Sequence, residues 1–244
     1  MIVAIIQARV VATRLPEKIL KDISGKPMLW HVVNRLMLSQ TIDDIVLAIP
    51  ASDQNDSLED FAKRLKLHCF RGSETDVLSR YYGAAVKFGG DVIVRVTADC
   101  PLIDPRVTDS IINTHMNSGV DYTTNDVEHG FTRGLDTEVF SVDTLARANQ
   151  EAKQDYEREH VTPYIYQHPD LFVLNFVEAS GKLKRPDLRL TVDTDDDLKL
   201  IREIYKGLYR DEQIFYTDDV IEFLDSHPEL KAINAHIRQK ELGK

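Results

Sequence analysis

The sequence predicts an α/β fold with a Rossmann-like, mostly parallel sheet flanked by helices. Short apolar, β-rich runs at 2–6, 45–50 and 92–97 alternate with helical patterns of ten or more residues. Strands that alternate with helices of this length are typical of βαβ units and a parallel sheet. The chain has 244 residues, 43% of them hydrophobic and 29% charged, which suffices for one sizeable core. We therefore expect a single domain over 1–244.

The first half of the chain presents its elements in regular order. Leu58, Phe61 and Ala62 recur at helical spacing, and Pro27 suits the first position of a helix. The predicted order is a strand at 2–6, a helix at 27–38, a strand at 45–50, a helix at 56–67, a brief strand at 68–70, a helix at 73–89, a strand at 91–99 and a helix at 105–119.

From about residue 121 the pattern loosens. We expect a small β-rich insertion over approximately 121–180 that closes over the first half. The elements expected here are strands at 121–125, 137–141, 171–177 and 188–192, and helices around 142–154, 158–167, 195–209 and 217–227. The last two helices begin with acidic residues, which suit a helix N-terminus.

Crossovers in βαβ units are right-handed, and they place the loops after Ile6 and Thr97 at the same edge of the sheet, where the strands have their carboxyl ends. Ligands bind at that edge in open α/β sheets. Polar residues in these two loops are therefore the first candidates for function.

Composition narrows the function classes. The formal net charge of −10 argues against nucleic acid as the main partner, because binding to a phosphate backbone needs a basic face. No apolar run approaches the roughly 20 residues that span a bilayer, and the start MIVAIIQAR lacks the pattern of a signal peptide. Two cysteines, without CxxC spacing, fit a reducing compartment. We expect a cytoplasmic protein with no membrane partner.

The loop after the first strand carries three cations, Arg9, Arg14 and Lys18, with Pro16 between the last two. A wrapped loop can point all three at one polyphosphate, with arginine forks and a lysine point charge gripping its oxygens. The alternative is three solvated surface charges. Their position after the first strand favours a phosphate site.

Two carboxylates occupy comparable positions. Asp99 ends a predicted strand before Cys100 and Pro101, and Asp193 follows the expected strand at 188–192. A carboxylate there is costly unless it caps, pairs or binds a cation. Two such groups could hold one or two divalent ions, and Mg²⁺ prefers one or two carboxylates plus phosphate oxygens. The alternative is that Asp99 only caps a turn, and Asp195, Asp196 and Asp197 are most simply the start of a helix.

Two further stretches are rich in polar residues. FTRGLDTEVFS contains Arg133, Asp136 and Glu138, and REHVTPYIY contains His160. They predict either a polar pocket for a hydroxylated, acidic second substrate or a hairpin and a helix with ordinary surface charge. Cys100 has no histidine nearby in sequence, which disfavours a nucleophilic role.

At this point the chain resembles a known family. The stretches 4–36, 70–85, 96–105, 133–141, 158–166 and 192–198 resemble, in the same order, the sugar cytidylyltransferases that activate Kdo and acylneuraminate-type sugars with CTP. The resemblance is strongest to the branch of the spore-coat polysaccharide biosynthesis protein F, and it covers essentially the whole chain. It implies a fold of the nucleotide-diphospho-sugar transferase type and a homodimer.

The resemblance also implies roles for individual residues. Arg9, Arg14 and Lys18 would hold the CTP phosphates, and Asp99 and Asp193 would bind Mg²⁺. The segment with Gly72, Ser73 and Asp76 would lie near the cytidine. The residues implied for the sugar or the dimer partner are Arg133, Asp136, Glu138 and His160.

The chain departs from the family pattern in the cationic loop. Val11 and Ala12 stand where a small residue and then a serine are usual, and Glu17 stands where glycine is common. A lost hydrogen bond to a charged group, worth about 1.5–3 kcal/mol, would weaken nucleotide binding about ten- to a hundredfold. We expect that restoring serine at position 12 tightens nucleotide binding.

Together with the resemblance, these observations predict an Mg²⁺-dependent transfer of CMP from CTP to a sugar, with an acidic sugar as the preferred candidate, and release of pyrophosphate. Two alternatives remain at this stage. A glycosyltransferase would use a metal bound by a DxD motif, for which Asp195, Asp196 and Asp197 are available. A nucleotide-binding protein with weakened activity would fit the departures at Val11, Ala12 and Glu17.

Overall fold

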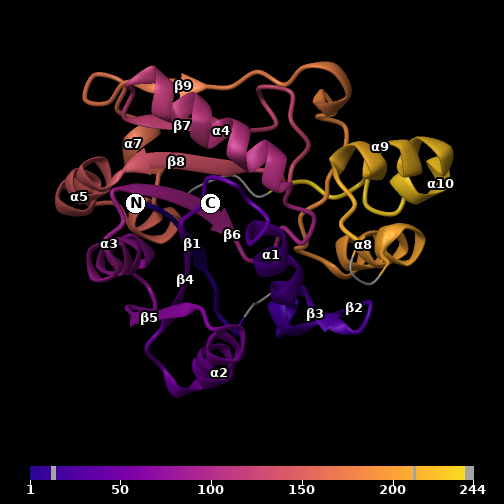
Figure 1. Ribbon diagram of the computed structural model, residues 1–244, viewed down its shortest axis with the longest axis horizontal. Helices are drawn as coiled ribbons and strands as arrows, with labels where there is room; N and C mark the ends of the chain where they lie inside the picture. The colour runs from indigo at the N-terminus through magenta and orange to yellow at the C-terminus, as the bar shows by residue number, and fades with distance from the viewer. Residues whose placement is uncertain (12–14, 211–212, 240–244) are drawn as a thin grey trace.

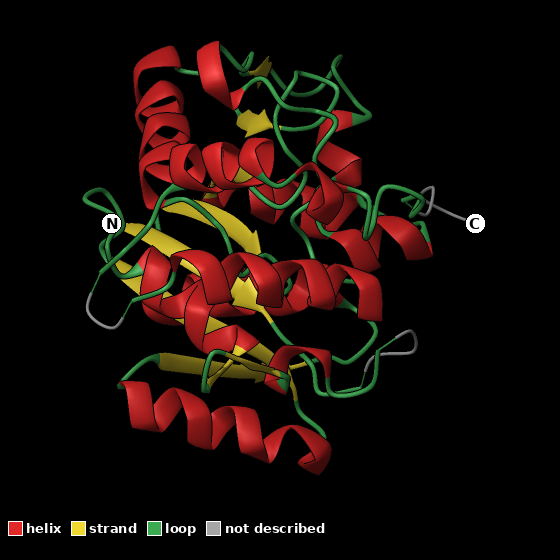
Figure 2. Cartoon of the chain, turned by 90° about the vertical axis from the view of Figure 1, so that its right-hand side faces the viewer, coloured by secondary structure: helices red, strands yellow, loops and turns green. Residues whose placement is uncertain are grey.

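The computed structural model describes residues 1–11, 15–210 and 213–239. A seven-stranded sheet in the order β5-β4-β1-β6-β8-β7-β9 runs through the molecule. In Figure 1, β5 with α2 and β9 with α4 lie toward opposite ends of the sheet, and α8, α9 and α10 gather at one side. Figure 2 shows the strands between layers of helices.

The strands are β1 (Ile2–Gln7), β2 (Asp22–Ile23), β3 (Lys26–Pro27), β4 (Asp44–Pro50), β5 (His68–Gly72), β6 (Val92–Thr97), β7 (Tyr122–Asn125), β8 (Thr137–Ser141) and β9 (Leu174–Phe176). The α-helices are α1 (Met28–Leu36), α2 (Asp56–Leu65), α3 (Val77–Phe88), α4 (Pro105–Ser118), α5 (Val142–Glu151), α6 (Asp155–His160), α7 (Pro163–Tyr166), α8 (Asp195–Leu208), α9 (Thr217–Ser226) and α10 (Pro228–Lys231). Short 3-10 helices are η1 (Lys18–Leu20), η2 (Asp53–Asn55) and η3 (Gly181–Leu183).

The sheet is mostly parallel where the sequence predicts βαβ units. Strand β1 pairs in parallel with β4 and with β6, and β4 pairs in parallel with β5. Gln7 at the end of β1 therefore lies beside Thr97 at the end of β6. This register confirms that the loops after β1 and β6 share one edge of the sheet.

Both faces of the sheet are buried. Alternate residues of β1 enter different cores: Val3 and Ile5 pack with α3, α5 and α7, whereas Ala4 and Ile6 pack with α1, α2, α4 and α8. This alternation follows from the two-residue period of a strand, and burial on both faces explains why β1 is a continuous apolar run.

Several predictions for the second half were wrong in detail. Residues 188–192 do not form a strand; only an isolated bridge between Arg189 and Arg133 is present. The expected helix at 158–167 is split between α6 and α7, and only 174–176 of the expected strand at 171–177 pairs. The strands β7, β8 and β9 extend the main sheet, with β8 antiparallel to β6. No helix in the described ranges is long and apolar enough to cross a membrane.

Candidate active site

A single ammonium group joins the two predicted carboxylates. Lys18 Nζ lies 2.8 Å from Asp99 Oδ2 and 3.0 Å from Asp193 Oδ1. Lys18 begins η1, Asp99 follows β6, and Asp193 precedes α8. Lys18 and the two carboxylates predicted from the sequence therefore meet beside the end of β6, at the carboxyl edge of the sheet, although Asp193 does not follow a strand.

The two carboxylate-bearing segments are held together by backbone hydrogen bonds. The Val192 amide donates to the Asp99 carbonyl at 2.9 Å, and Thr191 Oγ1 donates to the same oxygen at 3.2 Å. Thr97 Oγ1, at the end of β6, donates to Asp99 Oδ1 at 2.6 Å. These contacts fix where the Asp99 carboxylate lies relative to the segment that carries Asp193.

Arg189 positions Asp193 from the other side, and the sequence analysis missed it. Its Nη2 donates to Asp193 Oδ2 at 2.8 Å and its Nε to Asp197 Oδ1 at 3.0 Å. Asp197 is fully buried and also accepts from the Asp193 and Thr194 amides, as a helix cap. Its full use in this cap argues against a DxD-type metal motif at 195–197.

The mutual pairing shows in the pKa values. Burial lowers the pKa of Lys18, but Asp99 and Asp193 outweigh this effect and the pKa ends above its ordinary value. Burial raises the pKa of Asp99, yet Lys18 and the Thr97 hydroxyl bring it below its ordinary value. Both groups are therefore charged near neutral pH.

Asp136 belongs to a third loop that packs against the same segment. The Gly134 amide donates to Asp136 Oδ2 at 2.7 Å, and the Leu190 amide donates to the Arg133 carbonyl at 2.7 Å. Gly134 has φ +106°, and a Cβ there would lie 2.7 Å from the backbone of Leu190. Only glycine allows this approach. Burial raises the pKa of Asp136, and its charge helps raise that of Cys100, which places it close to the Asp99 loop.

The beginning of the cationic loop is anchored on the neighbouring strand connection. The Ala8 amide donates to the Ala48 carbonyl at 3.1 Å and the Val10 amide to Asn55 Oδ1 at 3.0 Å. Arg9 is exposed, whereas the predicted site residue Arg14, like Ala12, lies outside the described residues. Beside the loop is a hollow of about 550 Å³ lined by Val10, Val11, Pro16, Glu17 and Gln54.

Glu138 lies in a polar network rather than on the surface. Its Oε1 accepts from Tyr122 Oη at 2.6 Å and Thr162 Oγ1 at 2.5 Å, while Oε2 pairs with Arg95. Arg95 also donates to Gln7 Oε1 at 3.3 Å. The network thus connects β1, β6, β7 and β8 to the segment after α6.

His160 ends α6 next to an unusual turn. Val161 is buried with φ +75°, and the Thr162 amide donates to the His160 carbonyl at 2.9 Å. A positive φ at a β-branched residue is strained, and such strain concentrates at functional sites. Burial lowers the pKa of His160, and the positive charges of Arg95 and Arg9 lower it further.

Three residues predicted to lie near the nucleotide stand at the end of β5 and just after it. Gly72 ends the strand, and Ser73 Oγ accepts from the Asp76 amide at 3.0 Å. Asp76 caps α3 by accepting from the Ser79 amide at 2.9 Å, as expected for a helix start. It also pairs through both oxygens with Arg158, so its carboxylate is already used within the fold.

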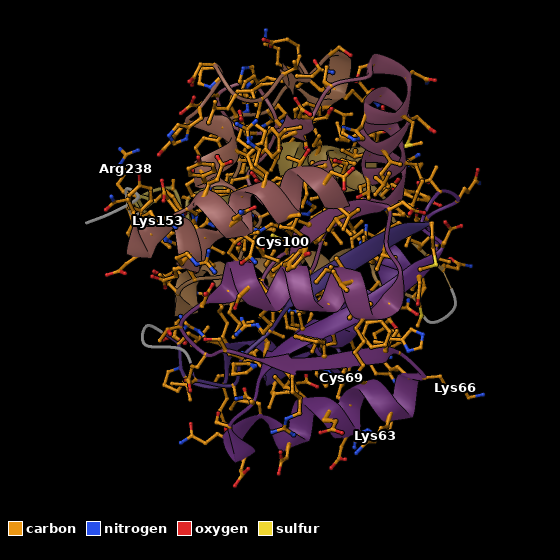
Figure 3. The ribbon with its side chains drawn as sticks, turned by 90° about the vertical axis from the view of Figure 1, so that its left-hand side faces the viewer. Lys63, Lys66, Cys69, Cys100, Lys153 and Arg238 are labelled. Atoms are coloured by element: carbon orange, nitrogen blue, oxygen red, sulfur yellow. The ribbon has the colours of Figure 1, made fainter. Side chains whose placement is uncertain are left out.

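Cys100 is an inert thiol in this setting. It is buried, and Figure 3 places it deep in the molecule, whereas Lys63 and Lys66 point outward at α2. Burial and the Asp99 charge raise its pKa well above the ordinary value. The prediction that Cys100 is no nucleophile agrees with this environment.

Comparison with known proteins decides the family. The family model described as "Cytidylyltransferase" matches residues 3–230. The chain belongs to the cytidylyltransferase family. This cytidylyltransferase is 38% identical to an uncharacterized protein, MJ1063, of Methanocaldococcus jannaschii over 98% of this chain and 96% of that protein. It is 34% identical to the spore coat polysaccharide biosynthesis protein SpsF of Bacillus subtilis over 84% of this chain and 86% of that one.

The solved structures agree. A cytidylyltransferase from Leptospira borgpetersenii superposes on this cytidylyltransferase with a TM-score of 0.88 and 30% identity, covering 98% of this chain and 99% of that one. The resemblance noted in the sequence and the α/β, mostly parallel fold are both confirmed. The chain is a nucleotidyltransferase.

Proposed function

We propose that this protein transfers CMP from CTP to a hydroxyl of an acidic sugar, releases pyrophosphate and depends on Mg²⁺, in the biosynthesis of a surface polysaccharide. One observation carries the proposal: Lys18, from the loop after β1, bridges Asp99 and Asp193. A loop cation beside a pair of carboxylates is the combination that a metal–triphosphate complex requires, and this supports the proposal.

The residues present fit a divalent cation. The described parts of the chain contain no group of three or more histidine, cysteine, aspartate or glutamate side chains arranged for a metal. Two carboxylates that already share one ammonium, with the remaining ligands supplied by phosphate oxygens and water, match the preference of Mg²⁺. Asp99 and Asp193 would hold the ion. When bound, it would neutralise charge on the reacting phosphates.

In the proposed reaction the sugar hydroxyl oxygen forms a bond to the α-phosphorus and gives up its proton to solvent, while the bond to the pyrophosphate oxygen breaks. Lys18 and Arg9, together with Arg14, would steady the leaving pyrophosphate. Catalysis of this kind is mostly positioning and stabilisation of charge. Arg189 would hold the Asp193 carboxylate in place through its 2.8 Å contact. The cytidine would lie near Gly72, Ser73 and Asp76.

The sugar would lie over the loops of β8 and α6. Arg133 and Asp136 lie on the loop held by Gly134, and His160 lies at the end of α6. A lowered pKa keeps His160 neutral, which suits a hydrogen bond to a sugar hydroxyl. Glu138 would act here through its network. We place the enzyme in the cytoplasm as a homodimer, with the segment 121–180 serving the sugar or the dimer.

The test is release of pyrophosphate from CTP and Mg²⁺ in the presence of a panel of acidic sugars. Asp99→Ala should lower the rate by at least about a hundredfold, the scale of losing one group that stabilises the transition state. Asp195→Ala is the matched control, because Asp195 is exposed at the start of α8. Undiminished turnover in Asp99→Ala would show that the proposed mechanism is wrong. Dependence on Asp195 and a nucleotide sugar would favour a glycosyltransferase.

A further inference from the structure

Arg80 is a buried arginine whose hydrogen-bonding capacity is almost unused. It lies in the first turn of α3 and is 3% exposed. A guanidinium carries five N–H donors, but here only Nη1 donates, to the Ser73 carbonyl. Its Nε is sealed from solvent and has no partner. Among residues 1–11, 15–210 and 213–239, no carboxylate lies within ion-pair distance of Arg80.

The charged groups around Arg80 do not neutralise its positive charge. Burial lowers the pKa of Arg80 and the positive charge of Arg9 lowers it further, so the pKa ends below its ordinary value although Tyr81, Glu74 and Asp76 act in the opposite direction. One of these acidic groups, Asp76, has both oxygens bound by Arg158. A buried charge without a partner is strongly unfavourable, so it persists where a ligand completes it.

The surrounding residues hold Arg80 in this place. A Cβ on Gly72 would lie 3.1 Å from Arg80 Cγ and 3.0 Å from Phe70, so glycine at this strand end leaves room for the arginine stem. The twelve-residue helix α3 adds the positive field of its N-terminus, which also favours an anion. The Ser73 carbonyl that accepts from Nη1 comes directly after β5, so the guanidinium lies near the end of this strand.

Arg80 lies apart from the paired carboxylates along the sheet edge. Strand β5 is three positions from β6 in the sheet order, or about 14 Å at the usual strand spacing. Arg9 follows β1, which lies between them. A substrate with its reacting phosphate at Asp99 and Asp193 can therefore reach Arg80 only with a second, separate group.

We propose that Arg80 and Arg9 form an oxyanion subsite that binds an acidic group of the substrates. The source of the oxyanion rests on the proposed function: it is either the terminal phosphates of CTP or the carboxylate of the acidic sugar. Both are planar or tripodal oxygen groups that an arginine fork grips in pairs. Arg80 is then a specificity-determining residue of this enzyme.

The experiment measures ligand binding by calorimetry, with cytidine, CMP, CTP, inorganic pyrophosphate and Kdo as probes. Arg80→Met keeps the aliphatic stem and removes the charge, and Arg80→Lys keeps the charge and removes the fork. Arg147→Met is the control, since Arg147 pairs with Glu151 on α5 and its loss changes the net charge equally. Melting temperatures without ligand accompany each variant.

If the phosphates are the source, Arg80→Met weakens the binding of CTP and pyrophosphate about ten- to a hundredfold. The binding of CMP weakens less, and the binding of cytidine does not change. If the sugar carboxylate is the source, Kdo binding weakens and the nucleotides are unchanged. In either case unliganded Arg80→Met should melt no lower than the native protein, because an uncompensated buried charge has been removed. If it melts lower, Arg80→Lys becomes the test variant. The affinities for the ligands should then fall in the same order, by smaller factors.

The proposal is overturned if both Arg80 variants bind pyrophosphate, CTP and Kdo as the native protein does. It is also overturned if cytidine loses as much affinity as CTP, since the contact would then be to the nucleoside. Failure of the native protein to bind CTP would contradict the proposed function instead, while the pyrophosphate arm would still test the subsite.

Discussion

Lys18 takes the position between two carboxylates that a divalent ion would need. Its ammonium contacts one oxygen of each, at 2.8 and 3.0 Å, while Arg189 stays on the second oxygen of Asp193. A divalent ion held by Asp99 and Asp193 could not share this space with a second cation, so it would compete with Lys18. We infer that a triphosphate, by attracting Lys18, makes room for the metal.

Lys18→Met should therefore bind Mn²⁺ more tightly than the native protein when no nucleotide is present, and bind CTP more weakly. The reason is that two negative charges lose their internal counter-ion while the phosphates lose a partner. Electron paramagnetic resonance titration of free Mn²⁺ measures the first effect and calorimetry the second. Lys21→Met should do neither, since Lys21 lies in the same segment but, within the described part of the chain, makes no hydrogen bond or ion pair to either carboxylate. Equal Mn²⁺ affinity in Lys18→Met and native protein would refute the competition.

Glu17 shows why its position favours glycine in the family resembled. Its backbone is left-handed, with φ 53° and ψ 28°, and its side chain is exposed beside the loop hollow. A non-glycine residue there costs about 1 kcal/mol, and glycine costs about as much through the entropy of the unfolded chain. Backbone effects on stability thus nearly cancel.

Glu17→Gly should leave the melting temperature almost unchanged and tighten CTP binding severalfold, because a negative charge near the triphosphate is removed. Lys66→Gly is the matched control: Lys66 is also left-handed, with φ 57°, but ends α2 away from the loop. CTP affinity measured by calorimetry should change in the first variant only. A gain in both would assign the effect to the backbone.

At the scale of elements, helix α1 contains a histidine that cannot easily be protonated. His31 is 2% exposed, its Nε2 lies 2.7 Å from the Ile23 carbonyl, and its ring packs against Tyr205. Burial lowers the pKa of His31 to about 4, with the positive charge of Arg35 adding to the effect. The neutral ring therefore joins α1 to the β2–β3 hairpin and α8.

This predicts a loss of stability in mild acid. The unfolded chain protonates His31 near pH 6.5 and the folded protein only near pH 4, so the folded state loses about 3 kcal/mol as the pH falls through this window. Urea unfolding at a series of pH values should show that His31→Gln removes this dependence. His68→Gln is the control, since the His68 side chain is 56% exposed. A slope unchanged by His31→Gln would contradict the prediction.

Elements also show where sequence patterns stop being informative. The apolar alternation of 188–192 predicts a strand, yet its backbone bonds go to the Asp99 and Arg133 carbonyls of two loops, with no neighbouring strand to pair. Asp193 was still found because it ends that segment. An alternating pattern of apolar residues predicts which side chains are buried. It does not predict which other segment of backbone lies beside them.

At the scale of the whole molecule, the parallel order of β1 and β6 made the meeting of Lys18 and Asp99 predictable, because crossover handedness brings such strand ends to one edge. Arg80 and Arg189 could not be found in that way. Arg189 has a weak signal, since it stands four residues before Asp193, but the missing partners of Arg80 become visible only when the fold is known. A role that depends on a missing contact cannot be predicted from the spacing of residues along the sequence.

The wide separation of the site residues along the chain has a consequence for biosynthesis. Lys18 and Asp193 are 175 positions apart. At about 5–20 residues per second, a ribosome adds the second carboxylate roughly 10–35 seconds after the lysine. Until then the nascent protein carries Lys18 and Asp99 without the second carboxylate of the pair. On the proposed mechanism, a chain interrupted before Asp193 would lack one of the two carboxylates that hold the metal, so activity would come only from polypeptides that extend beyond this residue.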